Sequence, residues 1–181
     1  MSSSLIKDYA KKQVFADENK FHFARHIIDK SVNLIQVNLN MEQYKNLQIF
    51  LWNDWSIFRS MHEKTNLTIN TNLPALPLKQ VVDYYGDIKN LLRTDRRVIH
   101  IEELKISICK NGYSNDGRLL IVKEAGSSNE YLVDGHHRAI AYLSLVNRAE
   151  VNYQELHCFV AEVNKISELF DTTLLLGSLR K

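Results

Sequence analysis

The sequence predicts a mixed α/β fold of the α+β kind: a small sheet with packed helices and an N-terminal helical extension. Two apolar patterns favour this fold class. In some segments apolar residues recur every three to four positions, as on one face of a helix, and shorter runs alternate or are continuously apolar, as in strands. The 181-residue chain has a globular composition, with 45% hydrophobic and 24% charged residues. Its length is sufficient for one folded unit with its own core.

The N-terminal third combines predicted helices with one strand. Helical spacing of apolar residues predicts a helix from about Asp17 to Asp29, and alternation predicts a strand from Val32 to Leu39. Asn40 is suited to cap a further helix, whose apolar spacing continues through Trp55 to about Met61. The aromatic residues of that helix are expected to lie in the core.

An irregular connection or an edge strand is predicted between Thr65 and Pro77, where both prolines lie. We place the domain boundary inside this connection. Residues 1–72 are expected to form the mostly helical extension, packed on the core, and residues 73–181 the main domain, whose motif is described below. Residues 79–92 are expected to be helix or loop.

The C-terminal half carries the clearest patterns. They predict, in order, a strand, a helix, a strand, a turn, a returning strand, a helix, a last strand and a C-terminal helix. The expected bounds are Val98–Ile101, Glu102–Cys109, Leu119–Lys123, Ala125–Asn129, Tyr131–Asp134, His136–Val146, His157–Val163 and Lys165–Leu176.

One motif carries chemistry: Asp134-Gly135-His136-His137-Arg138 stands where a predicted strand passes into a helix. Gly135 allows a tight turn and close approach of a ligand, and the start of a helix favours an anion. Arg138 suits phosphate oxygens, and His136 and His137 can donate hydrogen bonds or transfer protons near neutral pH. Asp134 is a candidate Mg²⁺ ligand or general base. The motif therefore predicts phosphate binding, although a solvated helix cap would use some of the same residues.

Around this motif, the order of segments resembles the ParB/sulfiredoxin superfamily over about residues 76–163. The similar segments are Ile99–Ile108, the Asn111-Gly112 turn, the strand Leu119–Val122 and the run Asp134–Ala141. The resemblance implies the superfamily fold and a nucleotide phosphate at the Asp-Gly-x-x-Arg turn.

The resemblance also implies roles for individual residues. Asp134, His136 and His137 would act in catalysis, with Asp134 holding Mg²⁺. The phosphates would be bound by Gly135, by both histidines, by Arg138 and by Ser107 on the preceding helix. The implied cofactors are ATP, or another nucleotide, and Mg²⁺.

Three functions stay open. The leading one is an ATP-binding ParB-like protein with ATPase activity, DNA-cleaving activity or both, of the kind found on mobile elements. The second is an ATP- or ADP-dependent kinase of a small molecule such as free serine. The third is a non-catalytic plasmid or phage regulator that binds DNA or a protein partner. Sulfiredoxins have a reactive cysteine at the position of His136, so peroxiredoxin repair is not expected.

Other residues admit two interpretations. Arg93, Arg96 and Arg97 could contact phosphate or nucleic acid, or form a solvated basic loop. His22 and His26 stand four residues apart and could bind a metal, or simply form a polar helix face.

Net charge, cysteine spacing and hydropathy bear on three classes of protein: nucleic-acid-binding proteins, disulfide or metal proteins, and membrane proteins. The net charge of +2 is too small to predict nucleic-acid binding by itself. The two cysteines show neither disulfide nor metal-site spacing. No segment reaches the roughly 18 apolar residues that a membrane span needs. We therefore expect a cytoplasmic protein that does not insert into membranes.

Overall fold

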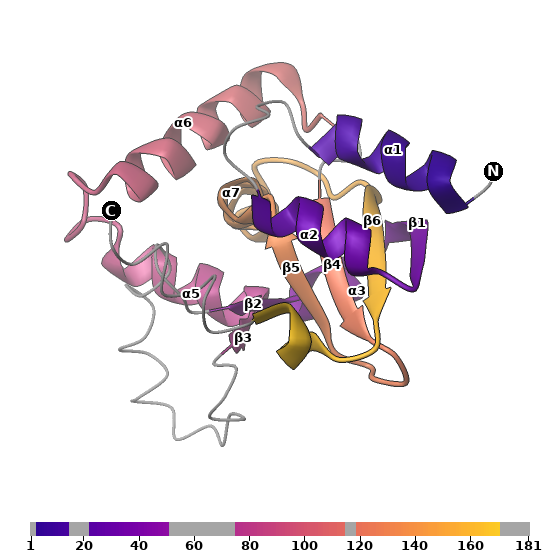
Figure 1. Cartoon of the computed structure of the whole chain (residues 1–181). Coiled ribbons are helices and arrows are strands. Elements are labelled where there is room, and N and C mark those ends of the chain that lie inside the picture. The colour runs from indigo at the N-terminus through magenta and orange to yellow at the C-terminus, as the bar shows by residue number, and fades with distance from the viewer. Residues whose placement is uncertain (1–2, 15–21, 51–74, 115–118, 171–181) are drawn as a thin grey trace. The chain divides into compact units, whose positions relative to one another are not determined.

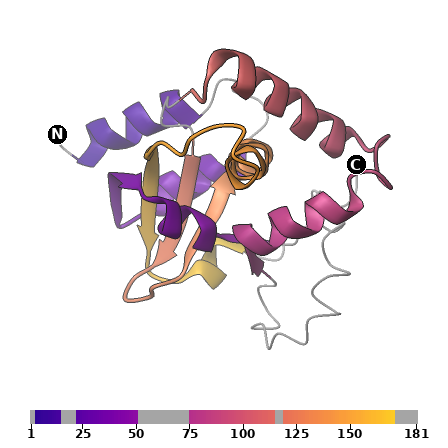
Figure 2. The same cartoon turned by 180° about the vertical axis from the view of Figure 1, so that it is seen from behind.

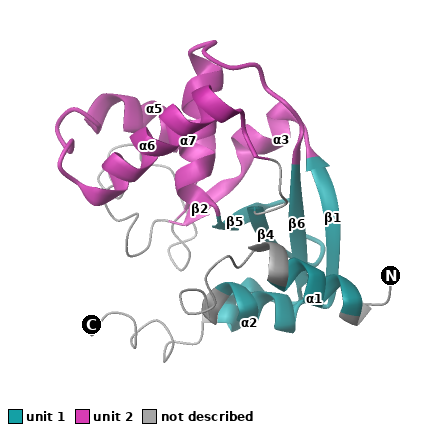
Figure 3. Ribbon diagram, turned by 90° about the horizontal axis from the view of Figure 1, so that it is seen from above, with its two compact units in different colours: residues 1–38, 116–134, 157–181 teal, residues 39–115, 135–156 magenta. Residues whose placement is uncertain are grey.

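The structure, a computed structural model, describes residues 3–14, 22–50, 75–114 and 119–170 (Figure 1, and from behind in Figure 2). It has the mixed α+β fold that the sequence predicts, with six strands and several helices in this part of the chain. The chain divides into two compact units, coloured separately in Figure 3. The first contains residues 1–38, 116–134 and 157–181, and the second contains residues 39–115 and 135–156.

The first unit contains four of the six strands of the sheet, together with helices. Its helical elements are α1 (Ser3–Val14), α2 (His22–Lys30) and the 3₁₀ turn η2 (Ile166–Phe170). Its strands are β1 (Asn33–Leu39), β4 (Leu119–Glu124), β5 (Glu130–Asp134) and β6 (Leu156–Val163). They lie in the order β1-β6-β4-β5, and β4 pairs parallel with β6 and antiparallel with β5.

The apolar run of β4 explains its central place in this sheet. Leu119 through Val122 are all buried, as is expected of a strand with covered faces and neighbours on both edges. Gly126, at φ 78°, provides the left-handed residue of the turn from β4 to β5. The helices α1 and α2 lie on one face of these strands (Figure 3), and α2 buries Ile27 and Ile28.

The second unit is mainly helical. Its helices are α3 (Met41–Asn46), α5 (Leu78–Ile88), α6 (Arg96–Asn111) and α7 (His136–Asn147). Two short strands, β2 (Gln48–Phe50) and β3 (Ala75–Pro77), pair antiparallel. Seven consecutive residues of α7, from Ala139 to Leu145, are buried. A helix covered on every side needs apolar or small residues all round, and this stretch supplies them.

Four tyrosines pack together around α7. Tyr113 lies 4.4 Å from Tyr142, and Tyr44, Tyr142 and Tyr153 lie 6.0 Å from one another, between ring centroids. Two of the hydroxyls donate to backbone carbonyls: Tyr44 to Ala139 at 2.9 Å and Tyr153 to Leu39 at 2.6 Å. The buried Tyr44 thereby ties α3 to α7, and the half-buried Tyr153 ties the segment after α7 to Leu39.

Most predicted elements are present. The strand at 33–39, the Asn40 cap, the β4–β5 hairpin, α7 and β6 agree with the predictions to within a residue or two. Asn40 forms a capping box with Gln43. The predicted helix from Asp17 is confirmed from His22 onward, and its first residues fall outside the described ranges. The predicted domain boundary between residues 72 and 73 also lies outside them.

Three predictions of secondary structure were wrong. The strand expected at Val98–Ile101 is part of α6, which runs unbroken from Arg96. The helix expected to continue from Asn40 to Met61 ends at Asn46 and is followed by β2; residues 51–61 are not described. The C-terminal helix expected from Lys165 is a 3₁₀ turn over its described residues.

From the cap at the start of α6 we predict how the stability of the protein changes in acid. The Asp95 side chain caps α6 by accepting from the Arg97 amide, and its carboxylate binds the Arg97 guanidinium at 2.8 and 2.6 Å. The side-chain hydrogen bond from Arg97 lowers the pKa of Asp95 from 3.8 to about 2. Because the folded-state pKa is depressed, this stability is present above about pH 4 and lost as the pH falls toward 2. Asp95→Asn keeps a capping oxygen and removes the charge.

We expect Asp95→Asn to lower the free energy of unfolding by about 1 kcal/mol at pH 7 and to flatten its decline between about pH 4 and 2. Urea titrations at several pH values measure both effects. Asp87→Asn, an exposed change on α5, is the control. An unchanged acid profile in Asp95→Asn would contradict the assignment.

Candidate functional site

The strand-to-helix junction predicted for the motif is present. Asp134 is the last residue of β5, in register with Leu120, and belongs to the first unit. Gly135 stands at the N-cap of α7 with φ 92°, and its carbonyl accepts from the Ala139 amide at 2.8 Å. This left-handed conformation explains the glycine, since a side chain there would be strained. The unit boundary falls between Asp134 and Gly135, so the rest of the motif belongs to the second unit.

The first turn of α7 gathers three side chains that suit an anion. His136, His137 and Arg138 are all half-buried. Gly135 offers no side-chain oxygen to this turn, whereas most N-cap residues place an acceptor there. The helix dipole adds positive potential at the same place. In composition, the turn is therefore more basic than an ordinary helix start.

A histidine that the sequence interpretation did not select lies beside this turn. The ring of His100, on α6, stands 5.0 Å from that of His137, at an interplanar angle of 69°. His100 also lies 3.7 Å from the Glu103 carboxylate, one helical turn on. The motif thus acquires a third imidazole from a distant part of the chain. The only signal in the sequence was the helical periodicity that extends α6 back to Arg96, and the strand prediction obscured it.

The positive charge of Arg138 acts on Tyr44 of the tyrosine cluster. Burial is the largest cause that raises the pKa of Tyr44, neighbouring tyrosines add to it, and the Arg138 charge acts in the opposite direction. The guanidinium therefore lies within electrostatic range of a phenol that is itself bonded to Ala139.

The other predicted site residues are placed differently. Ser107 is exposed on α6, where its hydroxyl accepts from the Asn111 amide at 3.4 Å. It stands seven residues beyond His100, or ~10 Å along the helix axis. Arg97 is bound to Asp95 as part of the α6 cap, and Arg93 and Arg96 are exposed.

The suggested metal site on α2 gains no support from its neighbours. His26 is half-buried, and Asp29 on the same helix pairs with Lys11 of α1 at 2.5 Å. Within the described ranges, no group of three or more His, Cys, Asp or Glu side chains is arranged to hold a metal ion. His22 lies at the first position of α2.

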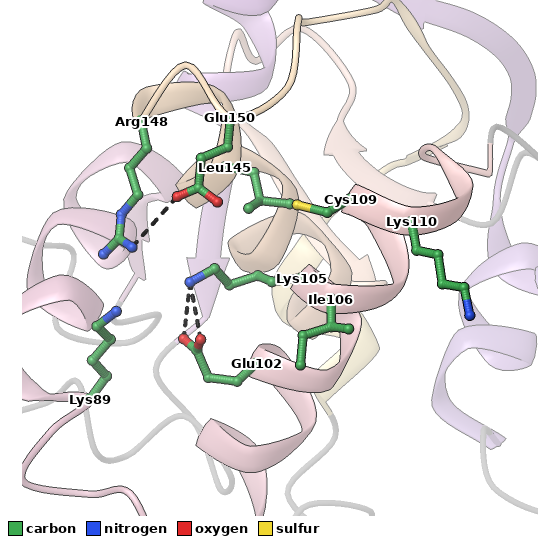
Figure 4. Close-up of a pocket in the computed structure, with 9 residues that line it drawn as sticks. All are labelled: Lys89, Glu102, Lys105, Ile106, Cys109, Lys110, Leu145, Arg148 and Glu150. Atoms are coloured by element: carbon green, nitrogen blue, oxygen red, sulfur yellow. Dashed lines mark hydrogen bonds and ion pairs between the residues drawn. The ribbon is translucent and has the colours of Figure 1, made fainter.

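A second cluster, missed at the sequence level, lines a pocket between α5, α6 and α7 (Figure 4). The pocket has a volume of about 530 Å³. At its base, Lys105 donates to both oxygens of Glu102 at 3.1 Å, and the Tyr85 hydroxyl donates to the same carboxylate at 2.6 Å. Lys89 and Arg148 lie around this pair. No local motif signals such a pocket, because the residues of α6 that line it meet Lys89, Leu145, Arg148 and Glu150 only when separate segments pack together.

Burial, hydrogen bonds and neighbouring charges shift the pKa values of three side chains at the pocket. Burial acts to raise the pKa of Glu102, but the hydrogen bonds from Tyr85 and Lys105 outweigh it and the pKa is lowered. Burial and the same hydrogen bond raise the pKa of Tyr85 well above its usual value. Burial lowers the pKa of Lys89, and the nearby charges of Lys105 and Arg148 lower it further.

Comparisons of the chain with models of protein families, with curated proteins and with solved structures found no match in any of the three. The resemblance to the ParB/sulfiredoxin superfamily therefore stays a prediction, and its first element, the strand at 98–101, is replaced by helix. Across the described ranges, none of the helices has the length and apolar character to traverse a bilayer.

Proposed function

We propose that the first turn of α7, Gly135–Arg138 with His100 beside it, binds the phosphates of a nucleotide, with ATP as the first candidate. The supporting observation is the basic helix start: a left-handed glycine cap with no side-chain acceptor, followed by His136, His137 and Arg138, all half-buried. Phosphate oxygens are the ligands that a helix start and a guanidinium bind best.

Each side chain would have a distinct role. The planar Arg138 guanidinium would bind two phosphate oxygens at once. The imidazoles would donate hydrogen bonds to phosphate oxygens, with the rings of His137 and His100 lying edge to face. Asp134, next in the chain to Gly135, would be a single carboxylate ligand of Mg²⁺, which commonly takes one or two carboxylates and completes its shell with phosphates and water.

The reaction class proposed is cleavage of a phosphoanhydride or phosphoester, in ATP, DNA or both. Such a reaction needs charge neutralisation around the phosphorus and a group that moves a proton to or from an oxygen. The proposed turn has a guanidinium for the first task and imidazoles for the second. DNA as a substrate would engage the exposed Arg93 and Arg96, whose phosphate contacts would weaken with added salt.

The proposal is tested by thermal-shift titration with ATP, ADP, CTP and GTP, each with Mg²⁺, followed by assays of ATP hydrolysis and DNA cleavage. At least one nucleotide should raise the melting temperature in a saturable manner, since a ligand that binds only the folded state stabilises it. Arg138→Gln should weaken binding about tenfold or more, because a charge-assisted bidentate contact is lost. Lys165→Gln, at an exposed position in the first unit, is the charge-matched control. Equal affinities in both variants, or no shift with any nucleotide, would refute the proposal.

A further inference from the structure

The pocket between α5, α6 and α7 holds more positive charge than its own carboxylates balance. Its lining has four basic side chains, Lys89, Lys105, Lys110 and Arg148, and two acidic ones, Glu102 and Glu150. All of them belong to the second unit, and the first turn of α7 contributes none of them. The excess charge is therefore a separate feature from the glycine cap.

The deepest cation is already neutralised. The side chain of Lys105 is only 8% exposed and is bound to both oxygens of Glu102. The same carboxylate accepts from the Tyr85 hydroxyl. With these three contacts Glu102 has little capacity to neutralise another cation, so the Glu102–Lys105 pair forms a fixed, nearly neutral base for the pocket.

Lys89 and Arg148, the two cations above the Glu102–Lys105 pair, are less well neutralised by carboxylates. Among the residues that the structure describes, no carboxylate lies within ion-pair distance of Lys89, and its ammonium points into the pocket toward Glu102 and Arg148 (Figure 4). Arg148 is paired only loosely, 3.7 Å from Glu150, and both side chains are nearly half exposed. Such a pair contributes little stability, so Arg148 can exchange Glu150 for another anion at low cost.

The remaining walls set the size and character of a ligand. Ile106 and Leu145 give the pocket an apolar side, and the sulfur of Cys109 points toward Leu145 (Figure 4). The volume of about 530 Å³ is in the range of small-molecule sites. A compact anion with two negative charges and several oxygens would satisfy Lys89 and Arg148 together.

We propose that this pocket binds a small phosphate-bearing molecule, with its phosphate between Lys89 and Arg148 above the Glu102–Lys105 pair. Burial of Lys89 beside two other cations, which lowers its pKa, makes a dianion at this place favourable because it would relieve their repulsion. The site is independent of the proposed function of Gly135–Arg138, and it would remain if that proposal failed.

The native cysteines provide a direct readout. Cys109 is exposed and lines the pocket, whereas Cys158 is buried and burial raises its thiol pKa to about 12. Because only thiolates react readily, a neutral reagent such as N-ethylmaleimide should modify Cys109 first, as followed by intact mass. Inorganic phosphate should slow that modification in a saturable manner, measured against chloride at equal ionic strength.

Variants then locate the phosphate. Lys89→Gln and Arg148→Gln should each raise the phosphate concentration for half-protection about tenfold. Lys79→Gln is the matched control: it removes the same charge from an exposed position of α5 in the same unit that does not line the pocket, and protection should change less than twofold. Melting temperatures of all variants establish that they fold.

Three results would overturn the inference. One is equal loss of protection in all three variants, which would mean general charge screening. Another is the absence of both protection and a phosphate-dependent rise in melting temperature. The third is loss of protection in Arg138→Gln with retention in Lys89→Gln, which would place the phosphate at the start of α7 and leave the proposed function standing.

Discussion

Tyr44→Ala should lower the free energy of unfolding by about 3–5 kcal/mol, the range found when a large buried aromatic side chain is truncated. Tyr44 is fully buried at the centre of the tyrosine cluster. The change removes its contacts with Tyr142 and Tyr153, and it also removes the donor to the Ala139 carbonyl. Urea denaturation at neutral pH measures the effect.

Tyr44→Phe removes the hydroxyl and keeps the ring. It should lower the free energy of unfolding by about 1 kcal/mol, the usual net contribution of one hydrogen bond. Because that bond ends at Ala139, amide exchange in the first turns of α7 should accelerate in both variants. Tyr9→Ala, a tyrosine 45% exposed in the first unit and in edge contact with Phe159, is the control and should cost no more than about 1 kcal/mol. Similar losses in Tyr9→Ala and Tyr44→Ala would contradict the central role of the cluster.

Local patterns predicted the elements whose signals lie within one segment. The hairpin β4–β5 has an apolar run, a Gly126 turn and a returning strand, and each part is visible in a few residues. The Asn40 capping box is equally local, since Asn40 and Gln43 satisfy each other's backbone amides. For such elements local preference and the final fold agree.

The wrong predictions of secondary structure lie where two local preferences competed, or where pairing with a segment far along the chain determined the structure. Val98, Ile99 and Ile101 are β-branched and favour a strand locally, but the Asp95 cap and the buried positions at 98, 101, 105 and 108 extend the helix through them. After Asn46, apolar spacing favours more helix, yet residues 48–50 pair with residues 75–77. A strand partner so far along the chain leaves no mark on the local pattern.

The candidate site also has a part that the local sequence predicts and a part that depends on the packing of separate helices. Gly135 and the residues after it were predictable because a left-handed cap and a basic first turn are properties of five consecutive positions. The contact of His137 with His100, and the pocket around Glu102 and Lys105, depend on how separate helices pack. Ser107 lies two turns beyond His100 on an exposed face, and its expected place near the phosphates stays a prediction.

Glu102→Leu should be the second severe change, lowering the free energy of unfolding by about 3 kcal/mol at pH 7. It leaves Lys105, only 8% exposed, without its carboxylate, and it leaves the buried Tyr85 hydroxyl without its acceptor. Glu102→Gln keeps an acceptor for both groups and loses only the charge, so its cost should be about half as large. Equal losses in the two variants would mean that the charge of Glu102, and not its role as a hydrogen-bond acceptor, accounts for the whole effect.

Removal of Lys105 together with Glu102 tests whether the unpaired charge causes the loss of stability. The double change Glu102→Leu/Lys105→Met should recover most of the loss at pH 7, because no uncompensated charge remains buried. If the double variant is no more stable than Glu102→Leu, the ion pair is not what holds α6 against α5 and α7.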